Sequence, residues 1–320
     1  MTYSRILGVG SFLPEKRMTN DDLAKVVETS DEWIFQRTGI KARHIADDFD
    51  NTSDLAVKAA RRALTHANTD PNEIDLIIVG TVTGDYAFPS TACLVQQKLG
   101  ITNNCPAFDI QAACAGFMYA MVMADAYIRG GLAKKVLIIG AETLSRIVNW
   151  QDRNTCVLFG DGAGAAVLGA SDEPGILHSK MCADGEFASV LHMNGRMNNG
   201  EWNGAKFINM DGQAVFKFAV KALSEVVKDT ITEANFPAEK IDWLVPHQAN
   251  SRIIDATAKH LGLPREKVIL TVSEHANTSA ASIPLALDEG IREGKIKRGQ
   301  HLLLEGIGGG FAWCAVLLRY

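Results

Sequence analysis

The pattern of apolar and polar positions defines two kinds of segment that follow one another along the chain. Apolar residues at helical spacing predict amphipathic helices over residues 56–67 and 219–234. After a short turn, each helix is followed by a continuous apolar run, "IDLIIVG" from Ile74 and "IDWLVPH" from Ile241. Continuous apolar runs are typical of strands that are covered by helices on both faces. The pattern therefore predicts an α/β fold with mixed, mostly parallel sheets that are layered with helices.

The order of these segments repeats within the chain. The run "KLGITNNCPAFDIQAAC" from Lys98 corresponds to "HLGLPREKVILTVSEHAN" from His260, and "KVLIIGAET" corresponds to "HLLLEGIGG" further along each half. Three corresponding pairs in the same order make chance similarity the weaker explanation, so we interpret the chain as an internal duplication. The expected halves are residues 1–172 and 173–320.

Three polar residues fall at the expected ends of strands. Cys114 and Asn277 follow the shared Leu-Gly at nearly the same separation in the two halves, and His247 ends the run "IDWLVPH". In covered parallel sheets, functional groups gather beyond the carboxyl ends of the strands. We therefore expect the three side chains to converge on one pocket between the halves.

Each of these residues also has an ordinary structural explanation. A lone cysteine is often a small buried residue, a lone histidine often only makes a hydrogen bond, and an asparagine before Thr-Ser often caps a helix. The glycine-rich "GIGGGF" at residues 306–311 could be a bare turn. The equivalent placement in the two halves favours a shared site instead. Because Cys114 precedes an apolar stretch that predicts a buried helix, the start of that helix is expected to favour the thiolate.

Charge and composition narrow the class of protein. The net charge of −5 gives no reason to expect nucleic-acid binding, and 47% hydrophobic with 22% charged residues is ordinary for a globular protein. We find no run long enough for a membrane span and no signal-peptide pattern, so we expect a cytoplasmic protein. The six cysteines are scattered without CxxC pairs, which predicts reduced thiols and neither a disulfide framework nor a metal site.

A set of short motifs identifies a family. "AACAGF", "PHQAN", "NTSAAS", "GGGFAW", "TSDEWIFQRTGI", "FPSTA" and "FGDGAGAAVL" resemble motifs of β-ketoacyl-acyl-carrier-protein synthase III, a thiolase-fold condensing enzyme. The resemblance extends over the whole chain. A Cys-His-Asn set distinguishes this family from the Cys-His-His elongating synthases. Plant-type polyketide synthases carry the same trio, but their chains are longer.

The resemblance implies a reaction and roles for four residues. The implied enzyme starts type II fatty-acid synthesis: it transfers acetyl from acetyl-CoA to Cys114, then condenses it with malonyl-acyl-carrier protein. The products are acetoacetyl-acyl-carrier protein, CoA and CO₂. His247 and Asn277 would donate hydrogen bonds to the enolate, and the backbone N–H groups of Cys114 and Gly309 would form the oxyanion hole. No cofactor is implied, because the CoA thioester is a substrate.

The resemblance also implies binding residues and partners. The residues expected to contact CoA are Trp33, Arg37, Arg153 and Asn250. The residues expected to line the acyl pocket are Phe88, Leu144 and Phe159, with Phe88 reaching across a homodimer interface. Lys217 and Arg252 would form a basic surface for the acidic carrier protein, and the ordinary alternative for both is a solvated surface residue.

Departures from the family pattern leave the primer open. Ile307 stands where a phenylalanine is common, Ala276 stands where a glycine is common, and residues 191–210 match poorly and are expected to line part of the pocket. The alternatives are a relative that uses longer or branched primers or serves secondary metabolism, and an acyl-CoA-binding scaffold without turnover. A thiolase-like acyltransferase or thioesterase is a third alternative. Thiolases need a second reactive cysteine, whereas Cys314 lies inside an apolar strand.

Overall fold

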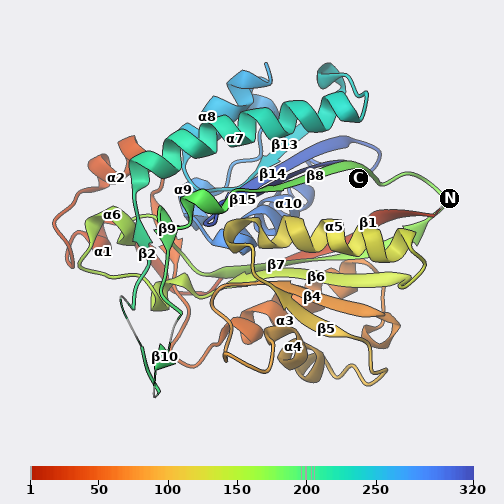
Figure 1. Ribbon diagram of the computed structural model, residues 1–320, viewed down its shortest axis with the longest axis horizontal. Helices are drawn as coiled ribbons and strands as arrows, with labels where there is room; N and C mark the ends of the chain where they lie inside the picture. The colour runs from red at the N-terminus through yellow and green to blue at the C-terminus, as the bar shows by residue number, and fades with distance from the viewer. Residues whose placement is uncertain (1, 196, 199, 203, 205) are drawn as a thin grey trace.

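Two β-sheets and three layers of helices alternate through the molecule (Figure 1). The structure is a computed structural model that describes residues 2–195, 197–198, 200–202, 204 and 206–320. The first sheet has the strand order β1-β7-β6-β4-β5, with β1 Tyr3–Phe12, β4 Leu76–Gly80, β5 Ala107–Ile110, β6 Lys135–Glu142 and β7 Gly162–Ser171. The second sheet has the order β13-β14-β15-β8, with β8 Ile176–Ala183, β13 Trp243–Pro246, β14 His301–Gly308 and β15 Ala312–Arg319.

The two sheets share one topology. In strand order and relative direction, β13, β14, β15 and β8 correspond to β4, β6, β7 and β1. A single parallel bridge from Val268 to Leu244 lies where β5 pairs with β4 in the first sheet. The α/β class with mixed sheets is confirmed, and antiparallel pairings are more numerous than expected because β7, β1, β15 and β8 all run antiparallel to their neighbours. The boundary predicted between residues 172 and 173 falls in the turn between β7 and β8 and stays a prediction.

Helices cover both faces of each sheet. The helices are α3 Thr52–His66 and α4 Thr91–Leu99 outside the first sheet, α5 Gly116–Arg129 and α10 Ser282–Arg292 between the sheets, and α7 Gly212–Glu233 and α8 Ser251–His260 outside the second. The helices predicted over residues 56–67 and 219–234 are α3 and α7. Asp211 accepts the N–H groups of Gln213 and Ala214, and this cap starts α7 at Gly212, earlier than the residue 219 that the apolar spacing indicated.

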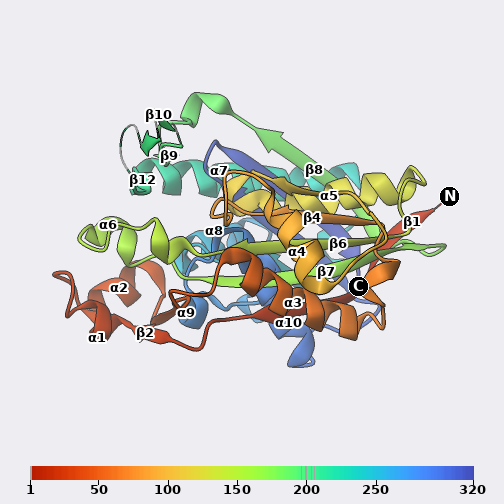
Figure 2. The same cartoon turned by 90° about the horizontal axis from the view of Figure 1, so that it is seen from below.

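Small elements gather at one end of the molecule, on the left in Figures 1 and 2. They are β2 Arg17–Thr19, α1 Asn20–Leu23, α2 Asp31–Thr38, β3 Ala42–His44, α6 Arg153–Cys156, β9 Leu191–His192, β10 Met197–Asn198, β11 Glu201–Trp202, β12 Asn209–Met210 and α9 Val272–His275. The parallel strands of both sheets point their carboxyl ends toward this end, so it is where functional groups are expected.

Candidate active site

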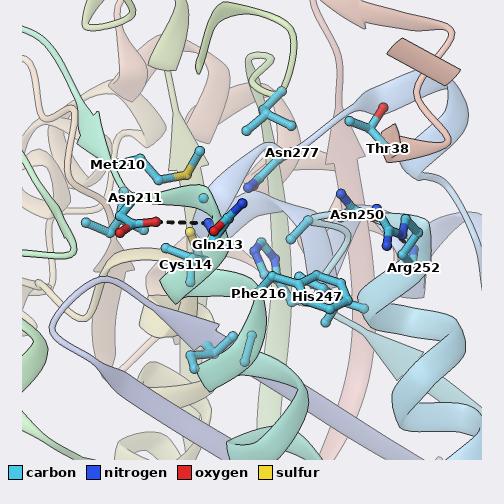
Figure 3. Close-up of a pocket in the computed structure, with 18 of the residues that line it drawn as sticks. Thr38, Cys114, Met210, Asp211, Gln213, Phe216, His247, Asn250, Arg252 and Asn277 are labelled. Atoms are coloured by element: carbon cyan, nitrogen blue, oxygen red, sulfur yellow. Dashed lines mark hydrogen bonds between the residues drawn. The ribbon is translucent and has the colours of Figure 1, made fainter. Parts of the chain in front are cut away.

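The predicted trio lines one pocket of about 780 Å³. Cys114 lies in a 3₁₀ turn, Ala113–Ala115, between β5 and α5. His247 directly follows β13, and Asn277 lies between α9 and the 3₁₀ turn Ser279–Ala281. Figure 3 shows the three side chains around the same pocket. The structure therefore brings together three residues that are far apart in the sequence.

Burial keeps the Cys114 thiol neutral. Its side chain is 8% exposed, and burial raises the pKa of the thiol to about 12. The polar Ser279 side chain opposes this pKa shift, while the charge of Glu142 adds to it. Burial therefore opposes the effect expected of the helix start, and the expectation that this start favours the thiolate stays a prediction.

The glycine loop approaches Cys114 closely. A Cβ atom at Gly308 would lie 2.5 Å from the backbone nitrogen of Cys114, so this position requires glycine. Ala113, just before the cysteine, has a φ of 46°, a left-handed conformation that is strained for a residue with a side chain. Among the described residues that line the pocket, Gly308 is present and Gly309 is not. The assignment of Gly309 to the oxyanion hole stays a prediction.

His247 is a neutral hydrogen-bond donor. Its ring is 5% exposed, and burial lowers its pKa to about 4. The Ser282 Oγ lies 2.5 Å from His247 Nδ1 and accepts the backbone N–H of Gln248 at 3.3 Å. A Ser282 hydroxyl that donates to Nδ1 would place the ring proton on Nε2, which is the tautomer expected from the sequence, and this assignment stays a prediction.

Asn277 is oriented by its own backbone neighbourhood. Its Oδ1 accepts the N–H of Ser279 at 2.8 Å, which leaves the Nδ2 group to face the pocket. Its backbone N–H donates to Leu158 O at 2.9 Å, and its carbonyl accepts the N–H of Gly160 at 3.0 Å. The loop is thus tied to the segment before β7, and the amide is presented as a donor that does not titrate.

Glu142 is a fully buried carboxylate beside the trio that the sequence analysis missed. It is the last residue of β6; its Oε2 accepts the Thr83 and Thr81 hydroxyls at 2.5 and 3.2 Å and the Val82 N–H at 3.1 Å. Its Oε1 accepts the Ser279 hydroxyl at 3.0 Å. Burial raises the pKa of Glu142 to about 7 in spite of these donors. The only signal in the sequence was a carboxylate that closes an apolar strand.

The four residues predicted to bind CoA lie together. Trp33, Arg37 and Asn250 line the pocket. The guanidinium groups of Arg37 and Arg153 lie 4.8 and 4.6 Å from the Trp33 ring centroid, and Arg153 also donates to Glu28 O at 3.2 Å. Asn250 caps α8 and donates to Arg37 O at 3.0 Å, so its side chain also has a structural task.

The two residues predicted to dock a carrier protein lie nearby. Lys217 and Arg252 both line the pocket, and the Arg252 guanidinium lies 5.3 Å from the Phe216 ring centroid. Together with Arg37 they give one side of the pocket a positive charge, in a protein whose net charge is −5.

The three residues predicted for the acyl pocket are not all in this pocket. Phe159 is 5% exposed and lines it. Leu144 is buried in the cluster that packs behind Phe159, but it is not among the described residues that line the pocket. Phe88 is 86% exposed on the loop between β4 and α4, outside the pocket of its own chain.

The positions that depart from the family pattern border the site. Ile307 lines the pocket, and Ala276 has a φ of 56°, which is why a glycine is the easier residue there. From the poorly matched stretch, Leu191 and Met210 line the pocket, while residues 196, 199, 203 and 205 lie outside the described residues.

Metal ligands, membrane spans and disulfides are all absent from the residues that the structure describes. These residues hold no group of three or more His, Cys, Asp or Glu side chains placed to bind a metal ion. Their helices include none whose length and apolar character would suffice to cross a bilayer. All six cysteines are free thiols, and Cys314 is buried within β15.

Comparison with known proteins gives consistent matches. Residues 108–185 match the family described as "3-Oxoacyl-[acyl-carrier-protein (ACP)] synthase III", and residues 231–320 match the C-terminal region of the same family. A β-ketoacyl-[acyl-carrier-protein] synthase III of Neisseria gonorrhoeae is 66% identical over 320 residues, which is 100% of both chains.

Solved structures match over nearly the full length as well. The 3-oxoacyl-[acyl-carrier-protein] synthase III of Aquifex aeolicus has a TM-score of 0.94 and 48% identity, and the match covers 99% of this chain and 100% of that one. The priming β-ketosynthase of the R1128 polyketide pathway also has a TM-score of 0.94, with 36% identity over 99% of this chain and 96% of that one.

Proposed function

The chain belongs to the 3-oxoacyl-[acyl-carrier-protein] synthase III family and is an initiating condensing enzyme of fatty-acid synthesis, and we propose that acetyl-CoA is its primer and that Cys114, His247 and Asn277 perform the reaction. The observation that carries this proposal is the single pocket in which a buried thiol, a neutral imidazole and an oriented amide meet.

Acyl transfer comes first. The Cys114 sulfur attacks the thioester carbonyl of acetyl-CoA, the carbon–sulfur bond to CoA breaks, and the proton that leaves Cys114 is balanced by the proton that CoA takes up. The tetrahedral oxyanion would accept the N–H groups of Cys114 and Gly309. A thiolate is both a good nucleophile and a good leaving group, so one cysteine suits the formation and the later cleavage of the acyl-enzyme.

Condensation comes second. The malonyl group on the carrier protein loses CO₂, and the charge that develops on its thioester oxygen would be met by His247 Nε2–H and Asn277 Nδ2–H. The carbanion attacks the acetyl carbonyl on Cys114, the bond to sulfur breaks, and Cys114 regains a proton. Neither donor is an acid at neutral pH, because burial lowers the pKa of His247 to about 4 with the ring already neutral and an amide does not titrate. The carbanion is therefore not quenched.

The proposal extends to binding and assembly. Trp33 with Arg37 and Arg153 would hold the adenine and phosphates of CoA, with Asn250 beside them. Lys217 and Arg252 would meet the acidic carrier protein at the pocket. Phe159 and Leu144 would limit the acyl group, and Phe88 would complete the pocket of a partner in a cytoplasmic homodimer. No cofactor takes part.

A secondary-metabolic role or a longer primer is the alternative. The 66% identity to a β-ketoacyl-[acyl-carrier-protein] synthase III, against 36% to a polyketide priming enzyme, favours the fatty-acid role. Replacement of a common phenylalanine by Ile307 at the pocket is the feature that bears on primer length.

The test is a substrate panel read by mass. The protein is incubated with malonyl-acyl-carrier protein and acetyl-, butyryl-, isobutyryl- or octanoyl-CoA, and the products are weighed. We expect acetoacetyl-carrier protein as the main product and, with acetyl-CoA alone, a mass gain of one acetyl group that C114S abolishes. A preference for isobutyryl-CoA or octanoyl-CoA would contradict the proposal that acetyl-CoA is the primer. Acetylation at one of the other five cysteines would overturn the nucleophile.

A further inference from the structure

The buried carboxylate of Glu142 connects two segments that lie far apart in the sequence. Its Oε2 atom accepts the Thr83 hydroxyl at 2.5 Å and the Val82 N–H at 3.1 Å, and the Thr81 hydroxyl lies 3.2 Å away. Its Oε1 atom accepts the Ser279 hydroxyl at 3.0 Å. One side chain therefore joins the loop after β4 to the turn before α10.

Ser279 also holds the amide of Asn277. Its backbone N–H donates to Asn277 Oδ1 at 2.8 Å, and because an N–H group only donates, this bond defines which end of the amide faces the pocket. Ser279 has a φ of 49°, a left-handed conformation that is strained for a residue with a side chain. Such a residue keeps its conformation through its surroundings, and within the described part of the chain its hydroxyl has one hydrogen bond, to Glu142.

The turn Ser279–Ala281 also lies directly on the backbone of β6. A Cβ atom at Gly140 would overlap the carbonyl oxygen of Ala280, so the strand and the turn touch without an intervening side chain. Alternate residues of a strand face the same way, so Gly140 and Glu142 share the face that meets this turn. Since Gly308 of β14 approaches the Cys114 turn in the same manner, each of the two strands supports the site residue of the other half.

We propose that Glu142 is a positioning residue for condensation, which holds the Ser279 turn and, through it, the Asn277 amide that donates to the enolate. This proposal rests on the proposed role of Asn277 in the malonyl step. In this role no proton moves to or from Glu142, and no covalent bond forms on it. The carboxylate acts through its hydrogen bonds, so a neutral side chain of the same shape can replace it if it keeps a bond on each side.

The loop that Glu142 contacts on its other side is anchored independently. The Thr52 hydroxyl donates to Thr83 O at 2.5 Å, and the Thr143 N–H donates to the Thr83 hydroxyl at 2.9 Å. These bonds hold the loop on the start of α3 and on the residue after β6. Loss of the bond between Glu142 and Ser279 therefore frees the turn that carries the site residue and leaves the loop in place.

Two variants of the full-length protein remove the connection, and a third restores it. S279A removes the hydroxyl but keeps the N–H that orients Asn277, and E142M removes the carboxylate but keeps a similar volume. We expect each to lower kcat for the decarboxylation of malonyl-carrier protein about 10-fold, less than the roughly 10²-fold that a 1 Å misplacement can cost. The KM for malonyl-carrier protein and the acetylation of Cys114 should change by less than about threefold. E142Q should regain most of the rate that E142M loses, because its amide accepts on the loop side and donates to Ser279 Oγ.

A double variant shows whether the effect passes through Asn277. N277A/S279A should decarboxylate malonyl-carrier protein no more slowly than N277A, because the amide that Ser279 orients is already absent. The matched control is S4A, which removes another buried hydroxyl that donates to a carboxylate, Asp125 Oδ1 at 2.5 Å, away from the described residues of the pocket. S4A should lower the thermal midpoint about as much as S279A does and leave both chemical steps unchanged.

The outcomes separate positioning from a general structural role. Unchanged decarboxylation in S279A or in a folded E142M overturns the proposal, and so does an equal loss of acetylation and decarboxylation or a further loss in the double variant. An E142Q protein as slow as E142M also overturns it, because charge and not bonding would then matter. If E142M unfolds, as judged by circular dichroism, S279A and the double variant decide the matter. Undiminished decarboxylation in N277A would instead overturn the proposed function of Asn277.

Discussion

The polar atoms of single side chains define what each member of the site can do. Asn277 presents Nδ2 to the pocket because Ser279 N–H occupies its Oδ1 at 2.8 Å. His247 would present Nε2–H if Ser282 donates to its Nδ1. Two donors beside one thiol support the proposed division of the three residues between two chemical steps.

Variants of Asn277 should therefore fail at one step only. N277A removes a donor aimed at the enolate oxygen and should slow malonyl decarboxylation by roughly 10²–10³-fold, while acetylation of Cys114 persists. N277D is nearly isosteric but places a carboxylate where negative charge develops, so it should be at least as poor in condensation. The two steps are measured separately, by release of CO₂ and by intact mass. Loss of acetylation with retained decarboxylation in N277A would assign Asn277 to acyl transfer instead.

The convergence of the trio on one pocket could be predicted from the sequence, whereas the residues that surround the trio could not. Cys114, His247 and Asn277 could be predicted because residue type and strand-end position both show in the sequence. Glu142 could not be separated from an ordinary last residue of a strand, because its partners Thr81 and Ser279 come from distant segments. The burial of Cys114 was hidden for a related reason: the sequence shows where a helix starts but not how deeply its first turn is buried.

At the scale of elements, the strand ends position the site residues, and close contacts at glycines set the distance between neighbouring elements. The end of β14 lies against the turn before α5, and a Cβ atom at Gly308 would lie 2.5 Å from Cys114 N and 2.7 Å from Ala112 O. These are backbone atoms, which cannot move aside as a flexible side chain could. The approach of β14 to α5 therefore depends on the absence of a side chain at this point.

Replacement of Gly308 should damage both stability and chemistry. G308A should lower the free energy of unfolding by roughly 1–3 kcal/mol, as overpacking of a close contact does, and should slow the acetylation of Cys114. G185A is the control, because a Cβ atom there would meet nothing within 4 Å. Urea denaturation and intact mass give the two readouts. A G308A protein that matches wild type in both would show that the turn relaxes without cost.

The limits of sequence-based prediction at this scale lie at the ends of elements. Helix α7 begins at Gly212, because Asp211 caps it, although the clear apolar spacing starts only at residue 219. The first turns of α7 face the pocket, where Val215 and Phe216 line it. Residues that line a pocket are not selected for the periodic burial that makes a helix visible in the sequence.

At the scale of the whole molecule, the buried carboxyl of Glu305 makes the free energy of unfolding depend on pH. Its Oε2 has no hydrogen-bond partner in the described part of the protein, and burial raises its pKa to about 8 from 4.5. Between pH 4.5 and about pH 8, the folded state binds more protons than the unfolded state. The stability that Glu305 contributes is therefore fully present below pH 4.5 and is lost as the pH rises through about 8. His247 acts in the opposite sense: burial lowers its pKa to about 4, so stability is lost as pH falls from 6.5 through that value.

E305Q should therefore raise the thermal midpoint by several degrees at pH 9 relative to wild type, with a smaller difference at pH 5. An amide of the same shape stays neutral, so the cost of ionisation disappears. The exposed Glu239 supplies the control, and E239Q should show no such pH dependence. Scanning calorimetry at the two pH values checks it. An equal difference at pH 5 and pH 9 would mean that Glu305 does not titrate differently in the folded and unfolded states.

Two exposed aromatic side chains predict how whole molecules associate. Phe88 is 86% exposed and Tyr86 is 64% exposed on one loop, an arrangement that leaves apolar area in water unless a second copy covers it. The same loop begins with Thr81 and Thr83, whose hydroxyls donate to the buried Glu142, so association would also order this part of the site. We expect a homodimer by light scattering at micromolar concentration, and F88D should shift it toward monomer and slow acetylation. L132D, which changes a 74% exposed leucine just after α5, should leave the dimer intact. A monomeric wild-type protein, or an F88D protein that remains a dimer, would show that this loop is not the interface.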